Sequence, residues 1–464
     1  MNVCFGCLSY RKVGGVRRVT FLGRPSNVKR CMDDLGRSSY GVVALACMML
    51  AATARAEDWP QWRGPRGDST SQELGLPLNW NEQRGIVWKV ELPGWGDSTP
   101  AVWQDAIFVT TQDDDKLLLM RLRRDNGQTV WSRQVGEAET PRGKPGRGSQ
   151  KFHDLHNNAS PSPVTDGKIV IAHFGNGVLA AYDFQGQQLW RRNLQDDYGP
   201  YSIWWGHANS PVLYGDLVIS VCMQDSLKGV SDQPAASYLV AHDKRTGKPK
   251  WKSARMTAAD AEECDSYTTP LLVSTPKGPQ LVVMGGNQLD GYDPNTGKQL
   301  WYLPGIVGGR TITGPTAGFD MVFATRGMFK DLLAVKLGGA GELTHRDVVW
   351  KETEATPDTC CPVLWGELLF TVSDKGIAKC YNAHTGHVQW KKRLPGEYKA
   401  SPIAAEGRIY FLNMHGVTTV VAAGDRFEKL AENALDDDTT ASPAIAGRRL
   451  YIRGKKFLYA VAKK

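Results

Sequence analysis

The chain has 464 residues, of which 41% are hydrophobic, and a formal net charge of +8. Most of this charge lies in residues 1–56, so the remainder carries 47 basic against 46 acidic groups. A near-neutral body excludes the concentrated basic face that nucleic-acid binding needs, and no apolar run is long enough to span a bilayer. We therefore expect neither a nucleic-acid partner nor a transmembrane segment in the mature chain.

Residues 1–56 have the pattern of a signal peptide or other targeting segment. A basic stretch precedes an apolar run at 40–52, and Ala-Arg-Ala at 54–56 is an A-x-A cleavage pattern. The alternatives are a short buried helix and a true start at Met32. We expect cleavage near Ala56, a periplasmic or otherwise extracytoplasmic location, and a lead-in segment at 57–85 before the main fold.

One repeating unit fills residues 86–464. It opens with a small residue and Pro, continues through two runs of alternating hydrophobicity separated by glycine turns, and closes with Trp; such glycines stand where hairpin turns require a positive φ. The opening prolines are Pro100, Pro163, Pro211, Pro270, Pro315, Pro362, Pro402 and Pro443. The closing Gly-x-x-x-Trp signal stands at 127–131, 186–190, 247–251, 297–301 and 386–390, and Trp350 closes a unit without that glycine.

This repeat predicts an all-β fold of one domain. Each unit provides four short antiparallel strands, and a single such sheet cannot bury both of its faces. Eight sheets stacked radially bury them and leave only short, protected edges. The closing Trp falls on the outer strand, where its ring can wedge between sheets and bury roughly 150–250 Å². We therefore predict an eight-bladed β-propeller over residues 86–464, and we expect a monomer.

The two ends of the repeat region predict that the ring closes. After Pro443 only 21 residues remain, which is enough for three strands and not for a fourth. At the front, residues 86–92 form a strand pattern with Trp88 but have no unit before them. We predict that this N-terminal strand completes the C-terminal blade. The alternative is an open solenoid with two bare ends.

Two sets of segments resemble known families. LAAYDFQGQQLW at 179–190 and LDGYDPNTGKQLW at 289–301 resemble the tryptophan-docking repeat of quinoprotein alcohol dehydrogenases and of BamB outer-membrane assembly lipoproteins. WPQWRGPRGDSTS at 59–71 and ASPIAAEGRIYFLNMHGVTTVVAAG at 400–424 are similar to exported PQQ-binding-like β-propeller proteins. The similarity covers about residues 57–464 and implies the eight-bladed fold, but it implies no defined activity.

The segments that lead into the opening prolines are the predicted binding site. In a propeller these segments open on one face around the central channel, and the longest insertions, at 136–158, 192–209 and 253–268, fall among them. Their flat aromatic and polar side chains suit a small planar or sugar-like molecule, a glycan or a protein segment; alternatively, these groups cap one another at the channel mouth. The candidate residues are Trp95, Asp97, His156, Asn157, Asn158, Trp204, Trp205, His207, Asp265, Arg310, Asp358, Tyr398, Lys399 and Asp438.

The enzyme interpretation rests on the adjacent pair Cys360 and Cys361. Quinoprotein alcohol dehydrogenases carry an adjacent-cysteine disulfide over PQQ and bind calcium. Under this alternative only, the resemblance to that family makes Cys360 and Cys361 cofactor-binding residues in a PQQ- and calcium-dependent dehydrogenase of alcohols or sugars. Against this, Cys361 occupies the slot filled elsewhere by Ser or Thr before the opening proline, and packing explains both thiols.

No phosphate loop, nucleophile elbow or His-Glu-x-x-His motif is present in the sequence. We therefore expect a non-catalytic binding module without a metal or cofactor. Two alternatives stay open, the PQQ-dependent dehydrogenase and a BamB-like outer-membrane assembly scaffold.

Overall fold

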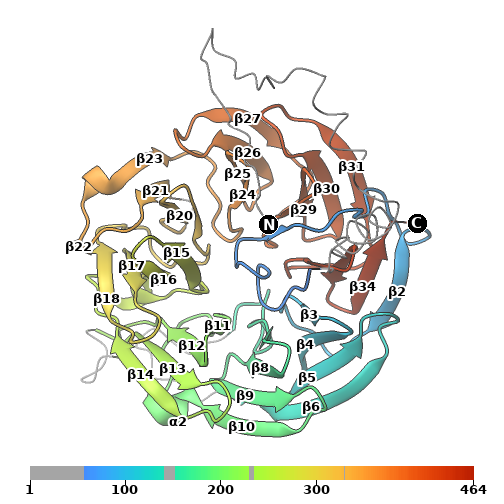
Figure 1. Ribbon diagram of the computed structural model, residues 1–464, viewed down its shortest axis with the longest axis horizontal. Coiled ribbons are helices and arrows are strands. Elements are labelled where there is room, and N and C mark those ends of the chain that lie inside the picture. Colours follow the sequence, from blue (N-terminus) through green and yellow to red (C-terminus); the bar gives the residue numbers. More distant parts are fainter. Residues whose placement is uncertain (1–56, 140–151, 229–234, 329, 464) are drawn as a thin grey trace, which may run out of the picture. The chain divides into compact units, whose positions relative to one another are not determined.

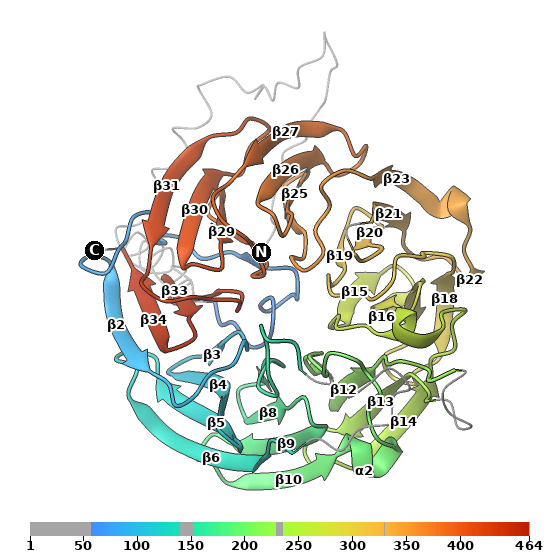
Figure 2. The same ribbon diagram turned by 180° about the vertical axis from the view of Figure 1, so that it is seen from behind.

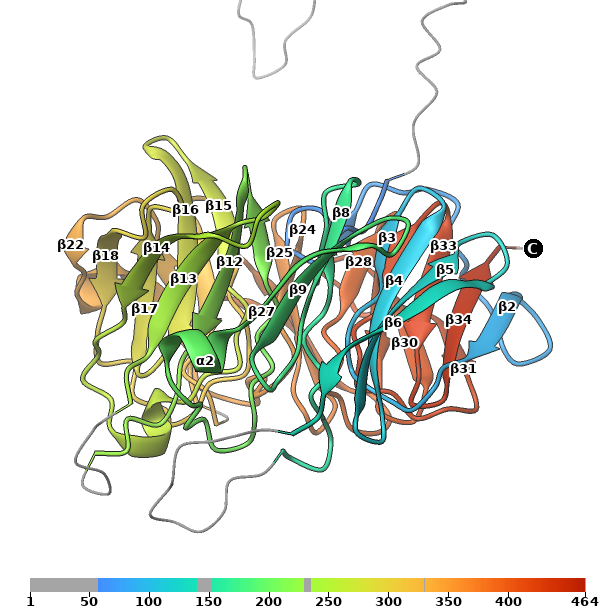
Figure 3. The same ribbon diagram turned by 90° about the horizontal axis from the view of Figure 1, so that it is seen from below.

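The computed structural model describes residues 57–139, 152–228, 235–328 and 330–463, all within one compact unit that begins at Ala56. The predicted targeting segment at 1–56 and residues 140–151 of the insertion at 136–158 lie outside the described residues. Eight sheets stand around a central axis, as Figures 1 and 2 show from the two sides. Figure 3 shows the ring edge-on, with the strands running between its two faces. Over the described ranges, no helix is long and apolar enough to cross a membrane.

Every sheet has four antiparallel strands, of which the first lies innermost and the last lies at the rim (Figure 1). The first blade holds β3 (Ala101–Trp103), β4 (Ala106–Asp113), β5 (Lys116–Arg123) and β6 (Thr129–Glu137). The second holds β7 (Val164–Thr165), β8 (Ile169–His173), β9 (Val178–Asp183) and β10 (Gln188–Asn193). The third holds β11 (Val212–Tyr214), β12 (Leu217–Cys222), β13 (Tyr238–Asp243) and β14 (Pro249–Ala254). The fourth holds β15 (Leu271–Thr275), β16 (Gly278–Gly285), β17 (Gln288–Tyr292) and β18 (Gln299–Leu303).

The same order continues through the second half of the ring. The fifth blade holds β19 (Thr316–Gly318), β20 (Met321–Thr325), β21 (Leu332–Lys336) and β23 (Val348–Glu352). The sixth holds β24 (Val363–Trp365), β25 (Leu368–Val372), β26 (Ile377–Asn382) and β27 (Val388–Arg393). The seventh holds β28 (Ile403–Ala405), β29 (Arg408–Leu412), β30 (Val417–Ala422) and β31 (Lys429–Ala434). The eighth holds β32 (Ala444–Ala446), β33 (Arg449–Arg453), β34 (Phe457–Ala462) and, from the other end of the chain, β2 (Ile86–Glu91).

The predicted ring closure is confirmed. Strand β2 pairs antiparallel with β34, with Glu91 opposite Phe457 and Ile86 opposite Val461. Two short parallel additions widen other blades: β1 (Thr70–Ser71) pairs with β28, and β22 (Gly341–Glu342) pairs with β18. Within the described residues, the connections hold one short α-helix, α2 (Leu194–Tyr198), and two 3-10 turns, at Ala261–Cys264 and His345–Asp347.

The tryptophan on the outer strand wedges between neighbouring blades, and the glycine of the closing signal makes room for it. The indole of Trp131 in β6 donates to the carbonyl of Phe184 in the second blade, 2.9 Å away. Gly186 has a φ of 84°, and a Cβ there would stand 2.9 Å from the Trp131 ring. The same docking joins Trp190 to Gly247, where an added Cβ would lie 2.7 Å from the indole. The glycine therefore serves both the turn and the previous blade's tryptophan.

The seventh blade lacks its own tryptophan, and the lead-in segment supplies one. Ala431 in β31 stands opposite Val420, where the sixth blade has Trp390 opposite Cys380. Trp80, before β2 in the chain, is 3% exposed and stacks on Tyr410 with ring centroids 6.5 Å apart. Its backbone N–H donates to the Asn433 side chain at 2.7 Å. The lead-in is therefore part of the packed ring.

Replacing Trp80 with Ala should destabilise the protein by about 3–5 kcal/mol, because it leaves a cavity between two blades. Urea unfolding followed by circular dichroism measures this loss. Leu74→Ala, in the same lead-in but at a side chain that is 66% exposed, is the matched control and should stay within about 0.5 kcal/mol of wild type. Equal losses for the two variants would contradict the wedge role of Trp80.

Candidate functional site

The residues before the opening prolines form a hydrogen-bonded ring around the channel. In most blades the backbone N–H of this residue donates to the side chain of its counterpart in the next blade. For example, Thr99 N donates to Ser162 Oγ at 2.9 Å, and Ser162 N donates to Ser210 Oγ at 2.9 Å. We call this set the pre-proline ring; its members are Thr99, Ser162, Ser210, Thr269, Gly314, Cys361, Ser401 and Ser442.

The cysteine pair has a place in this ring. Cys361 Sγ accepts from Gly314 N at 3.1 Å, and Cys361 N donates to Ser401 Oγ at 3.0 Å, so the thiol takes the position of a hydroxyl. Cys360 is fully buried in the core between the sixth and seventh blades. Both are free thiols, and burial raises the pKa of Cys360 well above its usual value.

The lead-in segment closes the channel. Arg63 is 2% exposed and donates to Pro315 O at 2.6 Å and Pro362 O at 2.9 Å, which ties the segment to the fifth and sixth blades. Its neighbour Trp62 lies against Gly314, where a Cβ would stand 3.2 Å from the indole. In Figure 1 the blue lead-in crosses the middle of the ring. The one member of the pre-proline ring without a side chain therefore makes room for Trp62.

A central cavity of about 250 Å³ lies on the loop side of Trp62, and a second cavity on its other side is lined by residues 61–63, 65–67, 211–213, 269–272 and 274. Trp62 and Thr269 line both cavities, so the two cavities meet at the Trp62 side chain, which we call the floor of the central cavity. The central cavity is lined by Trp62, Asp97, His153, Leu155, His156, Ser160, Ser162, Trp205, Ala208, Ser210, Tyr267, Thr269, Arg310, Ile312, Asp358, Thr359, Lys399, Ser401, Thr440 and Ser442.

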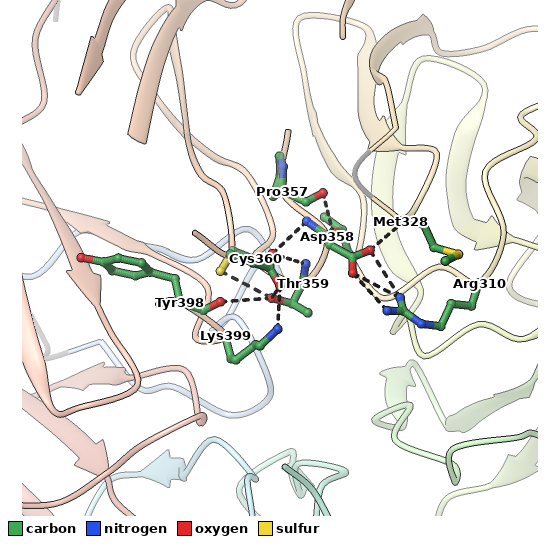
Figure 4. Close-up of polar contacts among 10 residues, drawn as sticks. Arg310, Met328, Pro357, Asp358, Thr359, Cys360, Tyr398 and Lys399 are labelled. Carbon is green, nitrogen blue, oxygen red and sulfur yellow. Dashed lines mark hydrogen bonds and ion pairs between the residues drawn. The ribbon is translucent and has the colours of Figure 1, made fainter. Parts of the chain in front are cut away.

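Two ion pairs form one wall of the central cavity (Figure 4). Arg310 and Asp358 meet at 3.2 Å, and Asp358 also accepts from Met328 N at 2.7 Å. Lys399 Nζ lies 2.7 Å from Asp374, whose carboxylate also accepts from the backbone N–H of Asp358 at 3.0 Å. The Arg310–Asp358 pair joins the segments before the fifth and sixth blades. The Lys399–Asp374 pair joins the segment before the seventh blade to the sixth blade.

A third carboxylate stands on the opposite wall. Asp97 accepts from the hydroxyls of Thr440 and, at 3.3 Å, Ser160. Burial raises the pKa of Asp97, opposed by these hydrogen bonds and by the nearby Arg453 guanidinium. Burial lowers the pKa of Arg453 to about 10. Ser160 Oγ also lies 3.3 Å from His156 Nδ1, so Asp97, Ser160 and His156 form one connected polar group facing the cavity.

The aromatic wall comes from the long loop before the third blade. Trp205 N donates to the hydroxyl of Tyr267 at 3.2 Å, and the His153 ring meets the Trp205 ring edge-on at 5.2 Å. Burial raises the pKa of Tyr267 well above its usual value, and the nearby Asp265 carboxylate raises it further. Contacts between loops of different blades therefore hold Trp205 at the cavity.

The structure brings six of the fourteen candidate residues together at the central cavity and places eight elsewhere. His207 and Asp265 are fully buried: the His207 ring stacks on Tyr201 at 5.1 Å, and Asp265 accepts from Trp204 N at 2.8 Å. Tyr398 points into the core, and Asp438 pairs with His415 at 3.2 Å on an exposed surface. The six that line the cavity are Asp97, His156, Trp205, Arg310, Asp358 and Lys399.

The remaining four candidates do not line the cavity. Asn157 donates to Trp95 O at 3.0 Å, and Asn158 donates to Gln112 at 3.2 Å, so both asparagines tie loops together. The Trp95 ring contacts Lys455 at 5.6 Å, and the Trp204 ring packs edge-on against Trp205 at 6.4 Å. We expected every candidate residue of these segments to face the ligand. The structure differs because neighbouring residues of one loop point in different directions, so only some of them reach the cavity.

Sequence reasoning missed several lining residues. Trp62 has no equivalent in the repeat, so nothing in the sequence placed it at the axis. The hydroxyls of Ser160, Thr359 and Thr440 stand in the same pre-proline segments as the predicted residues and could have been included on that ground.

Cys361→Ala should lower the free energy of unfolding by about 1–3 kcal/mol, because it leaves the buried Gly314 N–H without its acceptor. Cys361→Ser restores an acceptor of the type used by the other blades and should recover most of that loss. Thermal and urea unfolding of the two variants provides the comparison. A serine variant as unstable as the alanine variant would contradict the hydroxyl-like role.

Asp265→Asn should change how stability depends on pH. Burial raises the pKa of Asp265 well above its usual value, so the folded state holds a proton that the unfolded chain, with a pKa of about 3.9, has lost. The free energy of unfolding of the wild type therefore falls as pH rises from about 4 toward the folded-state pKa. The asparagine keeps an oxygen acceptor for Trp204 N and does not titrate.

The stability advantage of Asp265→Asn over the wild type should therefore grow with pH across that interval. Urea unfolding at a series of pH values measures the difference. Parallel pH profiles for the two proteins would show that the folded-state pKa of this carboxyl is not raised.

Comparison with known proteins gives the family. The family model described as "Outer membrane protein assembly factor BamB" matches residues 78–223 and 340–455, which is more than half of the chain. No curated protein matches the sequence.

Solved structures share the fold. BamB from Moraxella catarrhalis is 14% identical, with a TM-score of 0.54 over 82% of this chain and 97% of its own. The quinohemoprotein alcohol dehydrogenase from Comamonas testosteroni is 11% identical, with a TM-score of 0.64 over 90% of this chain and 82% of its own. A europium-containing methanol dehydrogenase is 9% identical, with a TM-score of 0.61 over 85% of this chain and 89% of its own. With its eight-bladed fold and this match, the chain belongs to the BamB family of PQQ-like β-propellers.

Proposed function

We propose that the chain is an extracytoplasmic binding module that holds a small ligand in its central cavity. The observation that carries this proposal is a central cavity with Trp62 at its floor and polar side chains from several blades in its lining. Concave sites with apolar faces and a few positioned polar groups are typical of small-ligand sites. The location rests on the targeting pattern of residues 1–56. A monomer without a nucleic-acid partner is part of the same proposal.

The residues present do not fit PQQ held under a cysteine ring with calcium. Cys360 and Cys361 are buried and do not line the central cavity. Asp97 and Asp358 stand in separate clusters, each engaged by side chains of this chain. Within the described residues, no group of three or more His, Cys, Asp or Glu side chains could hold a metal ion. The binding-module proposal therefore involves no cofactor step.

Ala208→Trp should abolish ligand binding, because a bulky indole at this lining position fills much of the cavity. The probes are neutral sugars, purine nucleosides, aromatic carboxylates, and PQQ with Ca²⁺, measured by ligand-observed NMR. At least one probe class should bind the wild type and lose at least tenfold in affinity in the variant. Ala258→Trp, at an exposed loop position, is the matched control and should bind as the wild type does.

Two results would contradict the proposal. One is the absence of binding by every probe class to the wild type, and the other is unchanged binding to Ala208→Trp. Saturable binding of PQQ with Ca²⁺, accompanied by dye reduction when an alcohol is added, would replace the binding module with a dehydrogenase.

A further inference from the structure

The charged groups of the central cavity are already paired. Arg310 is held by Asp358 at 3.2 Å, Lys399 by Asp374 at 2.7 Å, and Asp97 accepts from two hydroxyls with Arg453 behind it. A ligand with a net charge would have to compete with one of these partners, and separating a shielded ion pair leaves one charge unpaired. The cavity therefore favours a neutral ligand.

The paired groups still have hydrogen-bonding capacity. A guanidinium has five N–H donors, an ammonium has three, and a carboxylate has about four lone-pair positions. Lys399 Nζ contacts one carboxylate oxygen, and the second oxygen of Asp97 accepts from Ser160 at a long 3.3 Å. Hydroxyl groups match such a wall, because each both donates and accepts and can join a carboxylate to a neighbouring cation. A neutral ligand with several hydroxyls adds hydrogen bonds here without breaking an ion pair.

The floor and one side of the cavity are aromatic and apolar. Trp62 and Trp205 contribute indole side chains to the lining, and Leu155, Ala208 and Ile312 contribute apolar side chains. The negative face of an indole attracts the polarised C–H groups of a flat aliphatic ring. Polar edges with apolar faces are the arrangement found in a pyranose sugar.

From this chemistry we infer that the central cavity binds one neutral pyranose ring, with Trp62 and Trp205 against its faces and the Asp97, Asp358 and Lys399 groups at its hydroxyls. This inference rests on the proposed function and names the ligand class. A volume of about 250 Å³ lies near the lower end of the range of about 300–1,000 Å³ that is typical of small-ligand pockets. That is room for a single sugar unit, supplied either free or as the end of a glycan.

Titrations followed by tryptophan fluorescence test the ligand class. The neutral probes are D-glucose, D-galactose, D-mannose and D-xylose, and the charged analogues are D-glucuronate and D-glucosamine. At least one neutral sugar should bind, and its charged analogues should bind at least tenfold more weakly. Maltotriose and cellotriose separate the sources: tighter binding than glucose indicates the end of a glycan, whereas weaker binding indicates a free sugar.

Adjacent tryptophans provide a matched pair of variants. Trp205 lines the cavity and Trp204 does not, although both are partly exposed. Trp205→Ala should weaken sugar binding at least tenfold, and Trp204→Ala should change it less than threefold. Trp205→Phe keeps an aromatic face and should recover part of the affinity. Thermal unfolding of each variant checks that it is folded.

The outcomes separate this inference from the proposed function. If only nucleosides or aromatic carboxylates bind, and Ala208→Trp blocks them, the cavity is a binding site but the sugar inference is wrong. Charged sugars that bind as tightly as neutral ones also overturn it, as does equal loss in Trp204→Ala and Trp205→Ala. If nothing sensitive to Ala208→Trp binds, both the inference and the proposed function fail.

Discussion

The hydrogen bonds of the pre-proline ring fix the distance between the inner strands of neighbouring blades. The donor is a backbone N–H and the acceptor is a side-chain atom one bond beyond Cβ, so only a short Ser, Thr or Cys side chain fits the gap. These groups are buried, and an unpaired buried N–H costs about 1–3 kcal/mol. Because Ser162, Ser210, Thr269, Ser401 and Ser442 also line the central cavity, the contacts that hold the ring together also hold its walls in place. A site supported in this way is rigid before any ligand arrives.

The lead-in segment completes a ring that the repeats alone leave unfinished. Its tryptophans act at different places: Trp80 fills the wedge position that Ala431 leaves open in the seventh blade, and Trp62 blocks the channel. The following strand β2 then supplies the missing edge of the eighth blade. In repeat proteins each unit is stabilised mainly by its neighbours, so these contacts matter most where the two ends of the chain meet. The same segment thereby joins fold stability to the floor of the site.

The periodic part of the structure could be predicted from the sequence, because it is written at fixed spacing. The opening prolines, the closing tryptophans and the count of strands after Pro443 were enough to predict eight blades and the closure through β2. The loops before the prolines have no such period. Trp205 and His207 are two residues apart, yet the first lines the cavity and the second stacks on Tyr201 in the core. The orientation of each loop side chain depends on contacts with residues distant in sequence, such as the hydrogen bond from Trp205 N to the Tyr267 hydroxyl. The local sequence of the loop does not indicate these contacts.

The charged wall of the cavity also limits how its specificity can change. Arg310 and Asp358 come from segments before different blades, and Lys399 reaches Asp374 in a turn of the sixth blade. Each pair therefore joins neighbouring parts of the ring and contributes at least one side chain to the cavity lining. Removing one partner leaves a shielded charge unpaired, which is costly. Uncharged lining residues such as Ala208, Leu155 and Ile312 form no ion pair, so they can be substituted by side chains of other shapes at little cost to the stability of the fold. The shared propeller therefore says little about the ligand, whereas the residues between the fixed ion pairs determine which molecule the cavity accepts.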